Sequence, residues 1–225
     1  MKREDLKTLG VVAVFAAAMA FLEAVVVIYI RRMFYDGVFS FPLKGFIEPS
    51  ILQLEIVREF FTIVMLACIA ILAAKKLRER FAYFAFAFAV WDIFYYIWLK
   101  IAIGWPSSFL TWDVLFLIPW TWIGPVLAPV IVSLSLIALS IAIIQLSGKK
   151  SKIKITSLEI AGILIGFAII IYTFLNDYGA IVIQGKWDLI ASYTPQSYNW
   201  IAFAIGEVIA LASIARFYLR NKSVK

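Results

Sequence analysis

Long apolar runs separated by short polar segments dominate the hydrophobic pattern of this chain. A membrane-spanning helix needs about 20 mostly apolar residues, because the hydrocarbon core is about 30 Å thick and each residue rises about 1.5 Å. Lipid offers no hydrogen-bond partners to the backbone, so runs of this length must be helical. The pattern therefore predicts an all-α, polytopic membrane bundle in which residues 1–225 form a single domain. Its six transmembrane helices are expected at 8–30, 53–74, 81–103, 122–146, 158–175 and 198–219.

A seventh apolar segment, 108–119, precedes the fourth predicted helix and is too short to cross a bilayer. We expect it to lie at the membrane interface or to re-enter the membrane part way. Pro119, Pro125 and Pro129 follow closely, and a proline inside a helix removes one N–H and clashes with a preceding carbonyl. The fourth helix is therefore expected to be kinked or broken near its start.

Composition agrees with a membrane protein and removes several chemistries. The chain is 64% hydrophobic and 16% charged, whereas a soluble domain carries about a quarter charged residues. It has no histidine, which excludes imidazole-based catalysis by this chain. Its single cysteine, Cys68, can form neither an intrachain disulfide nor a CxxC pair. We expect no cofactor, and the sequence leaves a metal undetermined. Basic residues at helix ends account for the net charge of +7, so we expect no nucleic-acid partner.

Lysine and arginine are distributed unequally between the two ends of the predicted helices. Fifteen of the 21 basic residues lie at the end that carries both termini, and six lie toward the other end. Under the positive-inside rule this distribution predicts a multi-pass protein of the inner, cytoplasmic membrane with both termini in the cytoplasm. The lipid bilayer is then its first partner.

Four carboxylates interrupt the apolar runs: Glu23, Glu59, Asp92 and Glu207. Each costs at least about 2.5 kcal/mol in mid-bilayer, so such residues usually face a cavity or a partner. Counting inward from the outer helix ends places all four roughly 9 to 16 Å deep. Four helices then contribute to one layer, which predicts an outward-facing acidic pocket.

Further candidate ligand-binding residues surround this layer. Arg58 is within reach of Glu55, which shares a helix face with Glu59, while Tyr95 and Tyr96 share a face with Asp92. Asp113 stands in the second of two Trp-Asp pairs and completes the set. Three outcomes stay open for the carboxylates: ion pairs with basic neighbours, shared protons, or a bound hard cation or protonated amine.

Several segments within roughly the first 135 residues resemble a family of uncharacterised prokaryotic multi-pass membrane proteins. The most specific are Trp-Asp-Ile-Phe-Tyr-Tyr at 91–96 and Gly-Pro-x-x-x-Pro at 124–129, and further matching segments lie at 21–35, 58–59, 104–106 and 110–119. The resemblance implies a membrane bundle and no particular activity.

The leading functional hypothesis is a pocket that binds a cation, a proton or a cationic small molecule, for transport or in a receptor-like role. An alternative is a substrate-capturing or accessory subunit, similar to the S-components of energy-coupling vitamin importers, with Ala16, Ala20 and Ala24 packing against a membrane partner. Self-association into a homo-oligomer stays open. A membrane enzyme acting on a lipid is a third hypothesis, but no DDxxD run or Gly-rich phosphate loop supports it, so we favour a non-enzyme.

Overall fold

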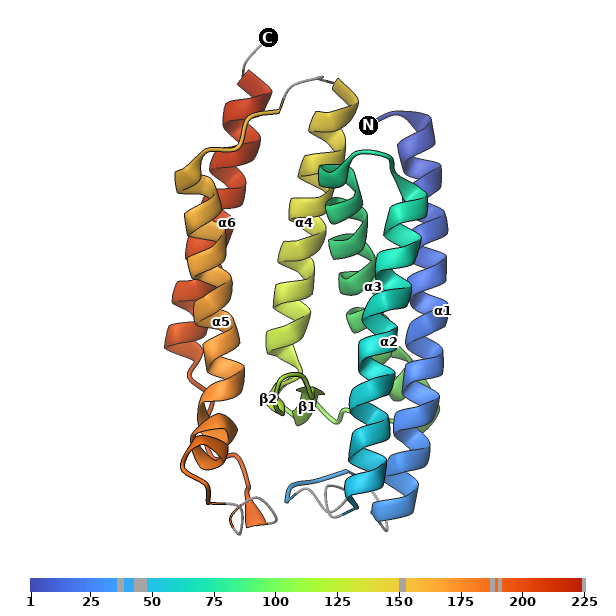
Figure 1. Ribbon diagram of the computed structural model, residues 1–225, viewed down its shortest axis with the longest axis vertical. Helices are drawn as coiled ribbons and strands as arrows, with labels where there is room; N and C mark the ends of the chain where they lie inside the picture. The colour runs from blue at the N-terminus through green and yellow to red at the C-terminus, as the bar shows by residue number, and fades with distance from the viewer. Residues whose placement is uncertain (36–38, 43–47, 150–152, 187–188, 190–191, 224–225) are drawn as a thin grey trace.

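Six helices are long and apolar enough to cross a membrane in the part of the chain described by the computed structural model (Figure 1). The description covers residues 1–225 except 36–38, 43–47, 150–152, 187–188, 190–191 and 224–225. The helices are α1 (Arg3–Phe34), α2 (Pro49–Ala73), α3 (Leu77–Ile103), α4 (Leu127–Lys149), α5 (Ser157–Ile183) and α6 (Trp200–Ser223). The predicted all-α membrane bundle of six spans is confirmed.

Both chain termini lie at the same end of the bundle in Figure 1, as six passes require. The connections after α1, α3 and α5 lie at the opposite end, which we call the distal end. The helix boundaries differ from the predicted ones by a few residues, most at α5, which continues to Ile183. At its start, Thr156 accepts a hydrogen bond from the Glu159 N–H, and the Glu159 carboxylate accepts one from the Thr156 N–H. This capping box fixes where α5 begins.

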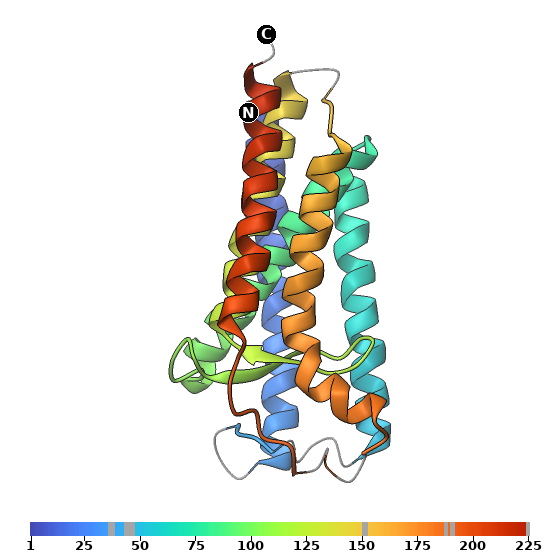
Figure 2. The ribbon, with the colours of Figure 1, turned by 90° about the vertical axis from the view of Figure 1, so that its left-hand side faces the viewer.

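The segment before α4 forms the first strand of a β-hairpin, and of the two expected arrangements, interfacial or re-entrant, the re-entrant one is not shown. Strand β1 (Trp112–Phe116) pairs antiparallel with β2 (Trp122–Pro125), with Asp113 opposite Gly124. Figure 2 shows the hairpin lying across the bundle toward the distal end, below α4. Pairing between the two strands satisfies their backbone groups, so this short apolar segment does not need to be helical.

The expectation that the fourth helix is kinked or broken near its start is also wrong, because most of the prolines belong to this hairpin. Pro119 lies between the two strands, Pro125 ends β2, and α4 begins only at Leu127. Pro129 falls in the first turn of α4, where a backbone N–H has no intrahelical partner to lose. The prolines therefore precede the fourth helix or stand at its start, and they do not interrupt it.

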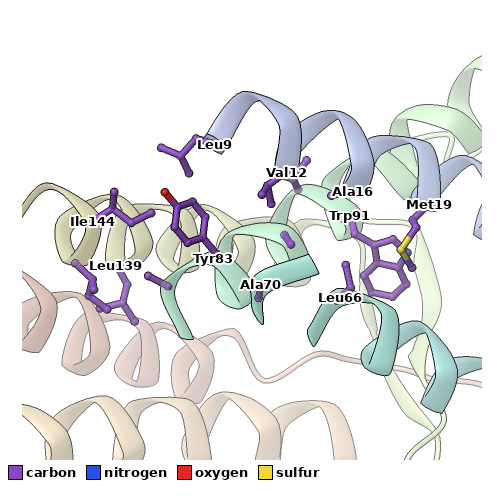
Figure 3. Packing of buried hydrophobic residues seen from close by; sticks show 14 of the residues in the cluster. Leu9, Val12, Ala16, Met19, Leu66, Ala70, Tyr83, Trp91, Leu139 and Ile144 are labelled. Atoms are coloured by element: carbon purple, nitrogen blue, oxygen red, sulfur yellow. The ribbon is translucent and has the colours of Figure 1, made fainter. Parts of the chain in front are cut away.

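The largest hydrophobic core lies where α1, α2, α3 and α4 meet (Figure 3). Val12 and Ala16 of α1 and Leu66 of α2 are buried there against Trp91 of α3. Ala20 and Ala24 continue the buried face of α1 that begins at Ala16. Small residues let the α1 backbone approach its neighbours closely, and α3 is the helix it packs against most.

Helices α5 and α6 form a separate close-packed pair built on small residues. A Cβ atom added at Gly166 would lie 2.7 Å from the Gly206 carbonyl oxygen, and one added at Gly162 would lie 2.1 Å from Ser213 Oγ. Only glycine allows this approach. Helix α4 packs against α3 on one side and α6 on the other, so it connects this pair to the rest of the bundle.

Candidate functional site

An acidic pocket lies between α1, α2, α3 and the β-hairpin. Its cavity has a volume of about 140 Å³, enough for several water molecules or a few heavy atoms of a ligand. Five carboxylates and two guanidinium groups line it. The lining residues are Glu23, Val27, Ile30, Arg31, Tyr35, Phe39, Ile51, Leu52, Glu55, Arg58, Glu59, Trp91, Asp92, Tyr95, Tyr96, Asp113, Val114, Leu115 and Leu117.

Arg58 on α2 neutralises two of the carboxylates. Its Nη1 donates to Glu23 Oε2 on α1 in a very short contact, and its Nε and Nη2 lie 2.9 and 2.8 Å from Glu55 Oε2. The guanidinium thus joins α1 to α2, which share few other contacts. The predicted contact between Arg58 and Glu55 is confirmed, and Glu23 is added to it.

Arg31, near the end of α1, forms the second ion pair of the pocket. Its Nη2 lies 2.9 Å from Asp113 Oδ1 on β1, and both side chains are less than a tenth exposed. The Phe39 and Trp105 rings lie 4.4 and 3.8 Å from the guanidinium carbon, which adds cation–π attraction. The same Nη2 lies 3.4 Å from the Tyr95 hydroxyl. This pair fixes the hairpin to α1.

Asp113 combines complete burial with incomplete pairing. Burial raises the pKa of Asp113 to about 6, against the opposing effect of Arg31. Its second oxygen, Oδ2, has no partner in hydrogen-bonding geometry among the described residues, although Tyr96 and the Val114 N–H are near enough to favour the charged form. One lone-pair face of this carboxylate is therefore still available.

Glu59 and Asp92 differ from the other three acids because no described lysine or arginine pairs with them. Glu59 is 7% exposed and accepts a hydrogen bond of 2.8 Å from the Leu117 N–H of the hairpin. Asp92 accepts one of 2.8 Å from the Ser133 hydroxyl on α4. Among the described residues, these two acids thus accept hydrogen bonds only from uncharged groups. They share the cavity with three other carboxylates and two arginines.

Aromatic side chains make up much of the remaining wall. Tyr95 and Tyr96 contact each other edge to face with ring centroids 5.0 Å apart, and Trp91 lies one turn earlier on α3. The Trp91 Nε1 is buried without a hydrogen-bond partner in the described part of the chain. Aromatic faces beside carboxylates provide two kinds of attraction for a positive charge.

Glu207 does not belong to this pocket. It lies on α6, is 5% exposed, and accepts a hydrogen bond of 2.8 Å from the Ser135 hydroxyl of α4. The expectation that four acids share one layer around one cavity is therefore wrong for Glu207. Equal depth along a helix places residues at one level, but it does not determine toward which neighbour each one points.

The structure thus brings together seven of the eight candidate ligand-binding residues. Glu23, Arg58, Glu59, Asp92, Tyr95, Tyr96 and Asp113 all line the cavity. Sequence reasoning left Glu55 and Arg31 out of the candidate set, although both were visible as ionisable residues beside it. Lys100, a basic residue near the end of α3, donates to the carbonyls of Gly104 and Pro106 and does not line the cavity.

No group of three or more aspartate, glutamate, cysteine or histidine side chains that could hold a metal ion is found among the residues described. Three of the five acids of the pocket are instead paired with Arg31 or Arg58.

No family model, curated protein or solved structure matches this chain. The resemblance based on residues 91–96 and 124–129 therefore stays a prediction, and the interpretation of the pocket rests on its own geometry.

Proposed function

We propose that this protein is a membrane-embedded binding protein, a carrier or a receptor, whose acidic pocket binds a small protonated amine. The observation that carries the proposal is the excess of carboxylates over guanidinium groups in one cavity, five against two. Arg58 and Arg31 account for Glu23, Glu55 and Asp113. Glu59 and Asp92 are then the two carboxyl groups left without a described basic partner, and in their ionised form they would attract a cationic ligand.

The walls favour an organic cation. Trp91, Tyr95 and Tyr96 present aromatic surface to the cavity, and aliphatic side chains of the hairpin complete it. An ammonium group gains from carboxylates and aromatic faces together, and it needs fewer oxygen ligands than a hard metal ion. The unpartnered Asp113 Oδ2 and Trp91 Nε1 offer one acceptor and one donor to a ligand of this kind.

The alternative of a subunit that docks through the small residues of its first helix is not favoured. Ala16, Ala20 and Ala24 are each at most 1% exposed within this single chain. Because other helices of the bundle already cover that face, it is not available to a partner protein. No contact in the described residues favours a lipid-processing enzyme.

The proposal is tested with protein purified in a nonionic detergent. Thermal unfolding is followed while ethanolamine is added, with Mg²⁺ as the metal probe, for the wild type and for Glu59→Gln and Asp92→Asn. Each amide keeps the shape of the side chain and removes its charge. Glu207→Gln is the matched control, because it removes a buried acid that lies outside the pocket.

We expect ethanolamine to raise the unfolding temperature of the wild type and of Glu207→Gln. The apparent affinity for ethanolamine should fall roughly tenfold or more in Glu59→Gln and Asp92→Asn, since a charged hydrogen bond is worth about 1.5 to 3 kcal/mol. Stabilisation by Mg²⁺ alone, or equal amine binding by all four proteins, would overturn the proposal.

A further inference from the structure

A second cavity lies at the distal end, between the last turns of α1 and α3. Its volume is about 330 Å³, and its lining contains Arg31, Arg32 and Trp105 together with Ile28 and Ile103. Unlike the acidic pocket, it has no carboxylate among the described residues that line it. The two cavities meet at Arg31 and Phe39, which line both.

The two arginines have unused hydrogen-bonding capacity. Arg31 is 7% exposed, and its Nη1 is buried without a hydrogen-bond partner among the described residues, while its Nη2 binds Asp113. Arg32 is exposed and makes no hydrogen bond or ion pair with any described residue. An arginine fork left open in this way matches the oxygens of a phosphate group.

The position of these arginines is unusual for the chain. They are adjacent, and they belong to the minority of six basic residues placed toward the distal end. Both stand in the last turn of α1. The buried ring of Trp105 lies 3.8 Å from the Arg31 guanidinium carbon and completes the wall of the cavity.

We propose that this cavity binds a phosphate group, that of an anionic membrane lipid, through Arg32 and the free edge of Arg31. The apolar side chains of Ile28 and Ile103 line the same cavity, where they would contact the first carbons of an acyl chain next to the headgroup. Arg32, unlike Arg31, does not line the acidic pocket, so a change at Arg32 tests this site separately from amine binding.

The test uses the full-length protein in dodecyl maltoside, a detergent without phosphate. Thermal unfolding is measured while phosphatidylglycerol, diacylglycerol or inorganic phosphate is added, for the wild type, Arg32→Gln and Lys186→Gln. Diacylglycerol supplies the acyl chains without the phosphate. Lys186→Gln is the matched control, because it removes one exposed positive charge after α5, away from the cavity.

We expect phosphatidylglycerol to stabilise the wild type and Lys186→Gln, with an apparent affinity about tenfold weaker in Arg32→Gln, and diacylglycerol to have no such effect. Stabilisation by inorganic phosphate that also depends on Arg32 would support the site and assign it to a soluble phosphate compound. An equal response of Arg32→Gln and Lys186→Gln to every probe would overturn the proposal, since general charge attraction would then explain binding.

Discussion

The two halves of the bundle bury their acids in different ways. On the side of α1, α2 and α3, five carboxyl groups and two arginines line a cavity, so the acids outnumber the described basic groups there. In the α5 and α6 pair, Glu159 is completely buried and paired with Arg220 at 2.8 Å, and Glu207 is bonded to Ser135. One half keeps space around its buried acids, whereas Glu159 and Glu207 in the other half lie outside the acidic pocket and bind a neighbouring side chain directly.

This difference follows from how the helices approach one another. Gly162, Gly166 and Gly206 bring α5 and α6 close together, because a Cβ atom at any of them would clash with the facing helix. On the other side the β-hairpin contacts α2 through the hydrogen bond to Glu59 and α1 through the ion pair of Asp113 with Arg31. A buried acid is thus a structural residue where packing is complete, and a candidate ligand residue where a cavity stays beside it.

The largest effect is expected from Asp113→Ala, which leaves the buried Arg31 without its counter-ion. Removing one partner of a buried ion pair costs about 3 to 5 kcal/mol, so the free energy of unfolding in mixed detergent micelles should fall by that amount. Asp177→Ala, an exposed acid near the end of α5, is the control and should change it by about 0.5 kcal/mol or less. Equal effects of the two changes would show that the pair does not hold the hairpin.

A smaller loss is expected in the close-packed half from Gly166→Ala. The added Cβ would lie 2.7 and 2.8 Å from backbone atoms of Gly206 and Ala210, which cannot move without separating the helices. The free energy of unfolding should fall by about 1 to 3 kcal/mol. Gly10→Ala is the matched change on α1, where nothing lies within 4 Å, and it should be neutral or slightly stabilising. Destabilisation by both would contradict the close contact of α5 and α6.

The smallest effects are expected from two serines of α4. Ser133 faces α3, and Ser135 faces α6 in the other half of the bundle. Ser135→Ala removes the donor from Glu207, whose Oε1 is already buried without a partner in the described chain, and should cost about 1 to 2 kcal/mol. Ser133→Ala removes the donor from Asp92, which lines the cavity, so water can replace the hydroxyl there. We expect Ser133→Ala to be the milder change in the same unfolding measurement, and the reverse order would contradict the comparison.

The amino-acid sequence determined the membrane fold, the six spans and the identity of most ionisable residues in the pocket. These features depend on the length of apolar runs and on the cost of charge in lipid, which act locally along the chain. The hairpin was missed because 108–119 has the composition of an interfacial segment, and strand pairing depends on a partner strand that begins after Pro119.

Only the tertiary structure decided which acids meet. Glu207 and Asp92 lie at similar predicted depths, yet one bonds Ser135 and the other Ser133, on different faces of α4. Likewise, Arg31 could be expected to extend toward the membrane surface, but it turns to Asp113 because the hairpin brings that carboxylate to 2.9 Å. Helix length sets the depth of a side chain in the membrane, whereas helix rotation and packing set its neighbours.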